Sequence, residues 1–340
     1  MKKLLNTLYV LTPDSYLYVR NGSVAIRVGT EEKYSIPAHN LDAIVCFWQN
    51  TVSTPLIGLC AENGITLAFI SGTGKFIGRF CGPVSGNVLL RKRQYQSIEQ
   101  QEFAAGIVQN ILYGKLRNSK AVLQRSARNL PDGEIRAALM VAAEQITELA
   151  RQLKGSPSID SMRGIEGAAA SVYFAQFDHM LRSEAFTFTV RSRRPPRNEV
   201  NAVLSFVYML LTREVQSALE TVGLDPAAGY LHTLRPGRPS LALDLMEELR
   251  APLCDRFVLS LFHKGQLTQK HFDTDAEAVY LNEQGKRTIL AAWQKRKAEV
   301  IQHPFLDERV QIGIIPYTQA MLLARVLRGD LDVYPPFVWR

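Results

Sequence analysis

The sequence predicts an α+β fold of more than one domain, in which a small β-rich N-terminal domain precedes a larger all-α domain. A length of 340 residues favours two domains. Short β-rich runs separated by turn residues fill the first eighty positions, whereas beyond Leu89 apolar residues recur every three or four positions, the period of a helix. We therefore place the β-rich domain, expected to mediate dimerisation, at residues 1–88, a linker at 89–98 and the helical domain at 99–340.

The β-rich region is expected to begin with a hairpin. Two runs of β-branched and aromatic residues within 16–28 flank Asn21-Gly22, a pair typical of a two-residue turn. The segment Thr54–Asn63 has apolar residues at helical spacing and Gly64 as its stop, so one helix is expected there. Further strands are expected at residues 34–36, 43–47, 66–70 and 75–81.

The glycine-rich segment Ser71–Lys75 invites comparison with a phosphate-binding loop. Such a loop needs the pattern G-x-x-x-x-G-K-[ST] between a strand and a helix. Here a strand is expected on both sides, so we interpret the segment as a hairpin turn and predict no nucleotide site.

Helical periodicity runs through most of the remaining chain. The segment Arg191–Arg197 interrupts it with four arginines and two prolines in seven residues, and we expect it to be an exposed loop. The expected helices lie within residues 103–116, 134–154, 165–181, 202–221, 240–249, 252–264, 277–302 and 312–328.

Composition narrows the class of protein. The chain is 46% hydrophobic and 21% charged, which excludes wholesale disorder, and its net charge of +8 favours an anionic partner. The four cysteines form no C-x-x-C pair, so we expect buried, reduced thiols rather than a zinc site or a disulfide framework. No membrane span and no cleavable leader are evident, and a soluble cytoplasmic protein is expected.

Acidic residues and one histidine in the helical half are the candidates for chemistry. Glu166 lies among small residues, so another backbone or a ligand could approach its carboxylate; from this segment alone, a solvated glutamate on an alanine-rich packing helix is the favoured interpretation. His232 by itself is more often structural than ligating.

The segment after His232 strengthens the case for a site. Asp244, Glu247 and Glu248 are spaced i, i+3 and i+4, so they are expected on one helix face, where like charges repel unless a cation lies among them. A solvated acidic face with Arg250 as counter-charge is the alternative. Carboxylates with one imidazole suit Mg²⁺ or Mn²⁺, and in a basic protein such a site suggests phosphodiester chemistry.

Taken together, the motifs resemble one family, the CRISPR-associated adaptation integrases, which are the first of the Cas proteins. The resemblance covers nearly the whole chain, and residues 1–10 and 334–337 are most similar to the type I-C branch. The motifs, in chain order, are Asn87–Tyr95, which resembles the linker of the family, Gly164–Gly167, Asn201–Tyr208, Gly229–His232 and Leu241–Glu248.

The resemblance implies a role for each candidate. Glu166, His232 and Glu247 would be the ligands of Mg²⁺ or Mn²⁺, and Asp244 would be a nearby catalytic acid, either behind the ligands or an alternative ligand. Glu248 matches no ligand of the family. The family often has aspartate where this chain has Glu247, and we expect the longer side chain to reach. Asn201 and Tyr208 fit supports near the site, although core packing explains them nearly as well.

The implied function is that of a metal-dependent DNA integrase and endonuclease. It would join the 3′-hydroxyl ends of short double-stranded DNA, the new spacer, to the CRISPR repeat by transesterification, and could cleave branched DNA. The resemblance also implies homodimers bridged by a small ferredoxin-like second Cas protein, and an iron–sulfur Cas nuclease that trims the donor ends.

Two other functions remain open. A non-catalytic nucleic-acid-binding scaffold of the same fold is disfavoured by the three intact ligands, and a hydrolase of small substrates leaves the basic segments unexplained. Those segments would bind phosphates, although each could equally be a solvated face. They are Arg91–Arg93, Arg191–Arg197, the pair Arg235 and Arg238, and Lys286–Lys297.

Overall fold

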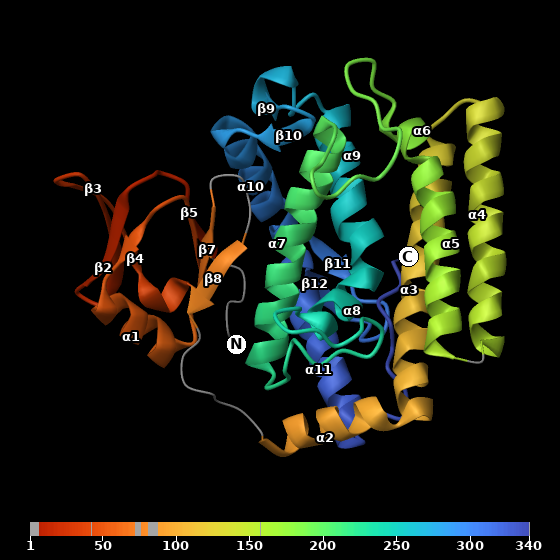
Figure 1. Ribbon diagram of the computed structural model, residues 1–340, viewed down its shortest axis with the longest axis horizontal. Helices are drawn as coiled ribbons and strands as arrows, with labels where there is room; N and C mark the ends of the chain where they lie inside the picture. The colour runs from red at the N-terminus through yellow and green to blue at the C-terminus, as the bar shows by residue number, and fades with distance from the viewer. Residues whose placement is uncertain (1–6, 42, 72–75, 81–87, 157, 340) are drawn as a thin grey trace. The chain divides into compact units, whose positions relative to one another are not determined.

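The computed structural model describes residues 7–41, 43–71, 76–80, 88–156 and 158–339, which form an α+β structure of two compact units (Figure 1). The first unit is β-rich and the second is mostly helical, in the order that the sequence predicts. The first unit comprises Met1–Gly86, Glu283–Glu299 and Gln311–Ile314, and the second comprises Asn87–Asn282, Val300–Val310 and Ile315–Arg340. Two segments of the expected helical domain, Glu283–Glu299 and Gln311–Ile314, thus group with the β-rich unit.

Within the described residues, the first unit contains two four-stranded sheets, of order β4-β3-β2-β6 and β1-β5-β7-β8. The predicted hairpin is confirmed: β2 and β3 pair antiparallel, and Asn21 and Gly22 have φ values of 49° and 70°. Strand β7 pairs antiparallel with β8, while Gly72–Lys75 of the expected turn lie outside the described residues. The strands are β1 (Thr7–Val10), β2 (Ser15–Arg20), β3 (Ser23–Val28), β4 (Glu31–Pro37), β5 (Ala43–Phe47), β6 (Thr51–Val52), β7 (Thr66–Ile70) and β8 (Phe76–Phe80).

The predicted helix of this unit is confirmed as α1 (Thr54–Asn63). The Ser53 hydroxyl accepts a hydrogen bond from the Leu56 N–H at 3.3 Å, and Gly64 ends the helix in the left-handed conformation, with φ of 65°. Buried Leu56 and Cys60 place one face of α1 in the core of the unit.

Helix α10 (Glu283–Ala298) also belongs to the first unit. Its Gln294 side chain donates a hydrogen bond to the Thr7 carbonyl at 3.3 Å, and the Lys286 ammonium lies 5.1 Å from the centre of the Trp48 ring. Lys286 and Lys297 are buried. The segment Lys286–Lys297 is therefore not a continuous solvated basic face.

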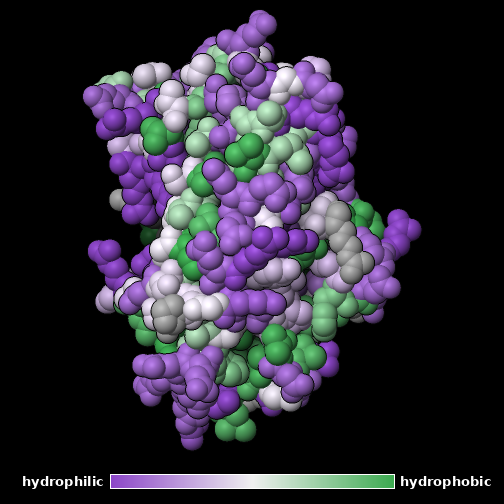
Figure 2. Space-filling view, turned by 90° about the vertical axis from the view of Figure 1, so that its right-hand side faces the viewer, coloured by the Kyte–Doolittle hydropathy of each residue, from purple (hydrophilic) through white to green (hydrophobic). Residues whose placement is uncertain are grey.

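In the second unit, α3, α4 and α5 lie side by side, and α8 packs against both α3 and α7 (Figure 1). On the side where α4 and α5 lie, hydrophilic side chains surround separate hydrophobic patches (Figure 2). The helices are α2 (Val88–Glu99), α3 (Gln101–Arg128), α4 (Glu134–Gln152), α5 (Ile159–Ala175), α6 (Phe177–Leu181), α7 (Glu199–Thr221), α8 (Ser240–Leu249), the π-helical turn η3 (Arg250–Asp255), α9 (Arg256–His263) and α11 (Ile315–Arg328).

The segment expected as a linker, 89–98, is helical and forms most of α2. Its buried Gln94 side chain donates to the carbonyls of Asp225 and Ala228 and accepts from the Asp225 N–H, all within 2.9 Å. Gln94 thereby supplies hydrogen-bond partners to three backbone groups of the loop that precedes α8.

The expectation of an all-α second half is wrong in two places. Residues 277–302 are helical only over Glu283–Ala298, because Ala278–Leu281 pairs with Phe272–Asp275 as the hairpin of β9 and β10. The Val279 N–H also donates to the Pro196 carbonyl at 2.9 Å, a tertiary contact that periodicity does not reveal. A second small hairpin joins β11 (Val300–Gln302) and β12 (Arg309–Gln311).

The described cysteines are buried free thiols, as expected: Cys46, Cys60 and Cys254, while Cys81 lies outside the described residues. Burial raises the pKa of Cys46 to about 12 and that of Cys60 to about 11, so both thiols stay protonated at neutral pH. No helix in the described part of the chain has the length and apolar character needed to cross a membrane.

Candidate active site

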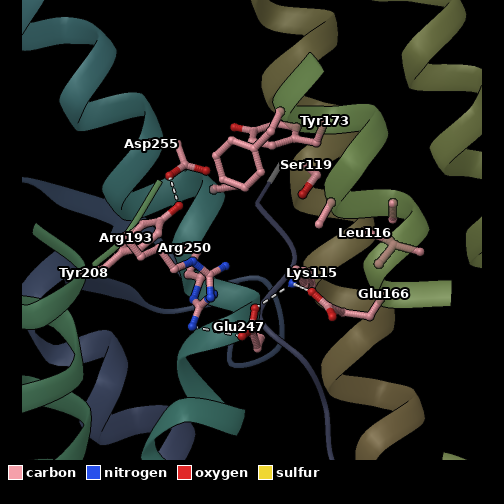
Figure 3. A pocket seen from close by; sticks show the side chains of 14 residues that line it. Lys115, Leu116, Ser119, Glu166, Tyr173, Arg193, Tyr208, Glu247, Arg250 and Asp255 are labelled. Carbon is pink, nitrogen blue, oxygen red and sulfur yellow. Dashed lines mark hydrogen bonds and ion pairs between the residues drawn. The ribbon is translucent and has the colours of Figure 1, made fainter. Parts of the chain in front are cut away.

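Three helices of the second unit bring one lysine and two glutamates together (Figure 3). The Lys115 ammonium on α3 forms an ion pair with Glu166 on α5 and lies 2.7 Å from Oε2 of Glu247 on α8. The Arg250 guanidinium lies 3.0 Å from the other carboxylate oxygen of Glu247. Two glutamates that lie 81 positions apart in the sequence thus contact one cation.

Glu247 is ionised although its side chain is only 4% exposed. Burial by itself would raise its pKa, but the charges of Arg250 and Lys115 outweigh burial and lower the pKa to about 2. His232 also lowers this pKa, by less than the two basic side chains do.

Lys115 belongs to none of the motifs that the sequence shows. This lysine lies next to Leu116 and within one helical turn of Ile111 and Leu112, all of them buried on α3. A lysine on an apolar stripe must be desolvated and needs an anionic partner, and that was the signal available in the sequence. Glu166 is the partner, and α5 packs closely on α3 and α4, as its small residues indicated.

Asp244 is fully buried and orients His232. Its carboxylate accepts the backbone N–H groups of Tyr230, Leu231 and His232 at 2.6, 2.9 and 2.9 Å, and it lies 2.6 Å from Nδ1 of His232. With its proton on Nδ1, the imidazole keeps the lone pair of Nε2 for another partner. Asp244 is committed to these four contacts, an arrangement that fits a positioning role better than a ligand role.

A glycine makes this arrangement possible. A Cβ atom at Gly229 would come within 2.7 Å of Oδ2 of Asp244 and of the backbone of Ser240 and Leu241. Because such contacts do not occur in real structures, only glycine lets the loop come this close to the start of α8.

The expectation that Glu248 shares an acidic face with Asp244 and Glu247 is wrong. Its carboxylate accepts hydrogen bonds from the Tyr334 hydroxyl, the Gln319 amide and the Phe337 N–H, at 2.6, 2.8 and 3.0 Å. The buried surroundings raise its pKa to about 8. Helix α8 is surrounded by protein, so its acids can find partners in different directions, and Glu248 fastens the C-terminal segment.

The loop Arg191–Arg197 is only partly the exposed segment that was expected. Arg191 donates to the side chains of Asn201 and Ser205 at 2.8 and 3.1 Å, whereas Arg193 and Arg194 are exposed. Asn201 therefore holds this loop against α7.

Lys115, Glu166 and Glu247 line a pocket, and Tyr208 forms part of its wall (Figure 3). Its hydroxyl donates to Asp255 at 2.6 Å, and burial raises the pKa of Asp255 to about 6. The Arg250 guanidinium lies 5.2 Å from the centre of the Tyr208 ring. The pocket, which Arg193 also lines, encloses about 30 Å³, room for an ion or one or two water-sized groups.

The donor types at this site fit a divalent cation. Glu166 and Glu247 offer carboxylate oxygens to one cation, and His232 can offer Nε2, a set that suits Mg²⁺ or Mn²⁺. Across the described ranges, no three His, Cys, Asp or Glu side chains stand in an arrangement that could hold a metal ion as they are, and Lys115 contacts both glutamates.

Comparison with solved structures identifies the fold. A solved casposase bound to integration product has a TM-score of 0.84 at 21% identity, covering 98% of this chain and 94% of that chain. A chain of a Cas6-RT-Cas1–Cas2 complex has a TM-score of 0.84 at 21% identity, covering 100% of this chain and 36% of that one. Both comparisons confirm the α+β fold.

The sequence comparisons are more specific. Residues 8–295 match the family model described as CRISPR associated protein Cas1. The CRISPR-associated endonuclease Cas1 1 of Chlorobaculum tepidum is 45% identical over 343 residues, which cover 100% of both chains. The chain therefore belongs to the Cas1 family, as its motifs predicted.

Proposed function

We propose that this chain is a metal-dependent DNA integrase and endonuclease of CRISPR adaptation. It joins the 3′-hydroxyl ends of short double-stranded DNA to the CRISPR repeat by transesterification. The observation that carries the proposal is the meeting of Glu166 and Glu247 on one cation; Asp244, which lies one turn before Glu247 on α8, orients the imidazole of His232. Membership of the Cas1 family and the name endonuclease of the Chlorobaculum tepidum relative support it.

The proposed roles follow from the contacts. Mg²⁺ or Mn²⁺ held by Glu166, His232 and Glu247 would polarise the phosphoryl oxygen and lower the pKa of the attacking hydroxyl. Asp244 keeps the Nδ1 proton of His232 in place, and Arg250 keeps Glu247 ionised. The exposed Arg193 at the pocket would contact the DNA backbone, since arginine binds phosphate oxygens in a fork geometry.

We propose the same partners that the sequence suggested. They are double-stranded DNA, a second copy of the chain, the small ferredoxin-like second Cas protein and, for a type I-C enzyme in the cytoplasm, an iron–sulfur Cas nuclease. The Cas1–Cas2 complex among the similar folds supports the second Cas protein. Exposed Lys92, Arg93, Arg194 and Arg235 support an anionic partner.

The test is strand transfer into a supercoiled plasmid that carries leader and repeat. A labelled short duplex with 3′-hydroxyl ends is supplied with Mn²⁺, with and without the second Cas protein. We expect His232→Ala to abolish joining and to leave DNA binding nearly unchanged. The double variant Arg193→Ala/Arg194→Ala should weaken binding and leave the joining step intact at saturating DNA.

The outcomes separate the candidate functions. If wild-type protein joins the label to the plasmid and His232→Ala does not, the result establishes both the integrase activity and its site. Tight DNA binding without joining under any condition would favour the non-catalytic scaffold. Normal joining by His232→Ala would refute the assignment of the ligands.

A further inference from the structure

We propose that Lys115 is an exchangeable internal counter-ion, which takes the cation position between Glu166 and Glu247 and must leave it when a divalent ion binds. The inference rests on the metal site proposed above. It adds a residue that the sequence did not single out and gives that residue a role opposed to the metal.

The contacts of Lys115 define the position. Its ammonium contacts a carboxylate oxygen of both glutamates, and its side chain is only 12% exposed. Divalent ions bind carboxylate oxygens at about 2.0–2.6 Å. An ion bound to the same two oxygens would lie against the ammonium, and two cations at that separation repel strongly in a site of low dielectric.

Arg250 is not equivalent to Lys115. It contacts Oε1 of Glu247, whereas Lys115 contacts Oε2, and it stacks over the Tyr208 ring. A planar guanidinium fixed by stacking and by a carboxylate keeps its place, while an ammonium on a flexible four-carbon chain moves easily. The site therefore has one permanent cation and one exchangeable cation.

Two consequences follow for the protein itself. Without metal, Lys115 neutralises two carboxylates that would otherwise repel across the contact between α3, α5 and α8. With metal, the same charge competes for the oxygens and lowers the apparent affinity. Replacement of Lys115 should thus destabilise the metal-free protein and tighten metal binding, two effects of opposite sign.

The test compares Lys115→Met with Lys120→Met, a matched change on α3 at a lysine that does not line the pocket. Mn²⁺ affinity is measured from the free-ion signal in electron paramagnetic resonance, and thermal unfolding is followed in chelator and in Mn²⁺. We expect Lys115→Met to bind Mn²⁺ about ten- to a hundredfold more tightly and to unfold at a lower temperature in chelator. Lys120→Met should match the wild type in both measurements.

A second variant protects the test against a folding defect. Lys115→Arg keeps the charge and can hold both carboxylates with a fixed fork, so it should bind Mn²⁺ more weakly than wild type. Binding by Lys115→Met no tighter than wild type, or by Lys115→Arg no weaker, would overturn the inference while leaving the metal site in place. Absence of Mn²⁺ binding in the wild type and every variant would overturn the metal site and the inference together.

Discussion

Asp244→Asn should separate the folding of this site from its capacity to bind metal. The change removes one negative charge and replaces one acceptor oxygen by an NH₂ group. Asp244 offers Oδ2 to the N–H groups of Tyr230 and Leu231, and Oδ1 to the N–H and the Nδ1 of His232. An asparagine can keep only one of these two pairs.

In the orientation of lower free energy, the oxygen of the new side-chain amide still accepts the N–H groups of Tyr230 and Leu231. The NH₂ group then faces His232, whose imidazole can accept at Nδ1 by moving its proton to Nε2, while its backbone N–H loses its acceptor. One unsatisfied buried N–H costs about 1–3 kcal/mol. The shifted proton removes the Nε2 lone pair, so we expect Mn²⁺ affinity to fall about ten- to a hundredfold.

The assay combines urea unfolding in chelator, Mn²⁺ titration and nitrogen-15 NMR of the imidazole. Asp160→Asn is the matched control, because Asp160 is exposed and pairs along its own helix with Arg163; the stability of this variant should stay within about 0.5 kcal/mol of wild type. The reasoning is refuted if Asp244→Asn binds Mn²⁺ as tightly as wild type with the His232 proton still on Nδ1.

Two further changes test the packing around the site. Glu247→Gln should cost about 3–5 kcal/mol at pH 7, because it leaves Lys115 and Arg250 as buried charges without this partner. Since the pKa of Glu247 is lowered to about 2, its contribution is complete above the unfolded-state value and lost as pH falls from about 4.5 to 2, so denaturation curves should converge there. Gly114→Ala should cost about 1–3 kcal/mol, because its Cβ would lie 2.9 Å from Cβ of Pro336. Gly106→Ala on the same helix meets nothing within 4 Å and should instead stabilise by about 0.5–1 kcal/mol; equal effects in urea unfolding would contradict the close contact.

The parts of this fold that depend on local chemistry could be predicted from the sequence. Asn21-Gly22 favours positive φ at two successive positions, which defines the first hairpin. Ser53 accepts a backbone N–H at the start of α1, and Gly64 ends the helix in the left-handed conformation. At the site, residue type and spacing made Glu166, His232, Asp244 and Glu247 candidates, and the resemblance to the family assigned their roles; that Glu166, His232 and Glu247 bind metal stays a prediction.

The parts that depend on distant partners could not be predicted. The spacing predicts that Glu248 lies on the same helix face as Glu247. The side chain of Glu248 instead points toward Gln319 and Tyr334, which lie more than seventy residues away in the sequence and donate hydrogen bonds to its carboxylate. Likewise, Ala278–Leu281 carries an apolar run that suits a helix or a strand, and pairing with β9 decides between them. Lys115 has a role only because α5 and α8 supply two carboxylates.

The π-helical turn η3 has a consequence for how this protein can change in evolution. Helices α8 and α9 form one helical run through η3, and a π turn holds one more residue than an α turn. Each residue advances an α-helix by about 100°, so loss of one residue between Glu247 and Asp255 would rotate α9 by that angle. Asp255 would then leave Tyr208, while Glu247 kept its partners on α3 and η3. The interval between these two acids is therefore constrained in its length, and homologous sequences should vary there by substitution and not by insertion or deletion.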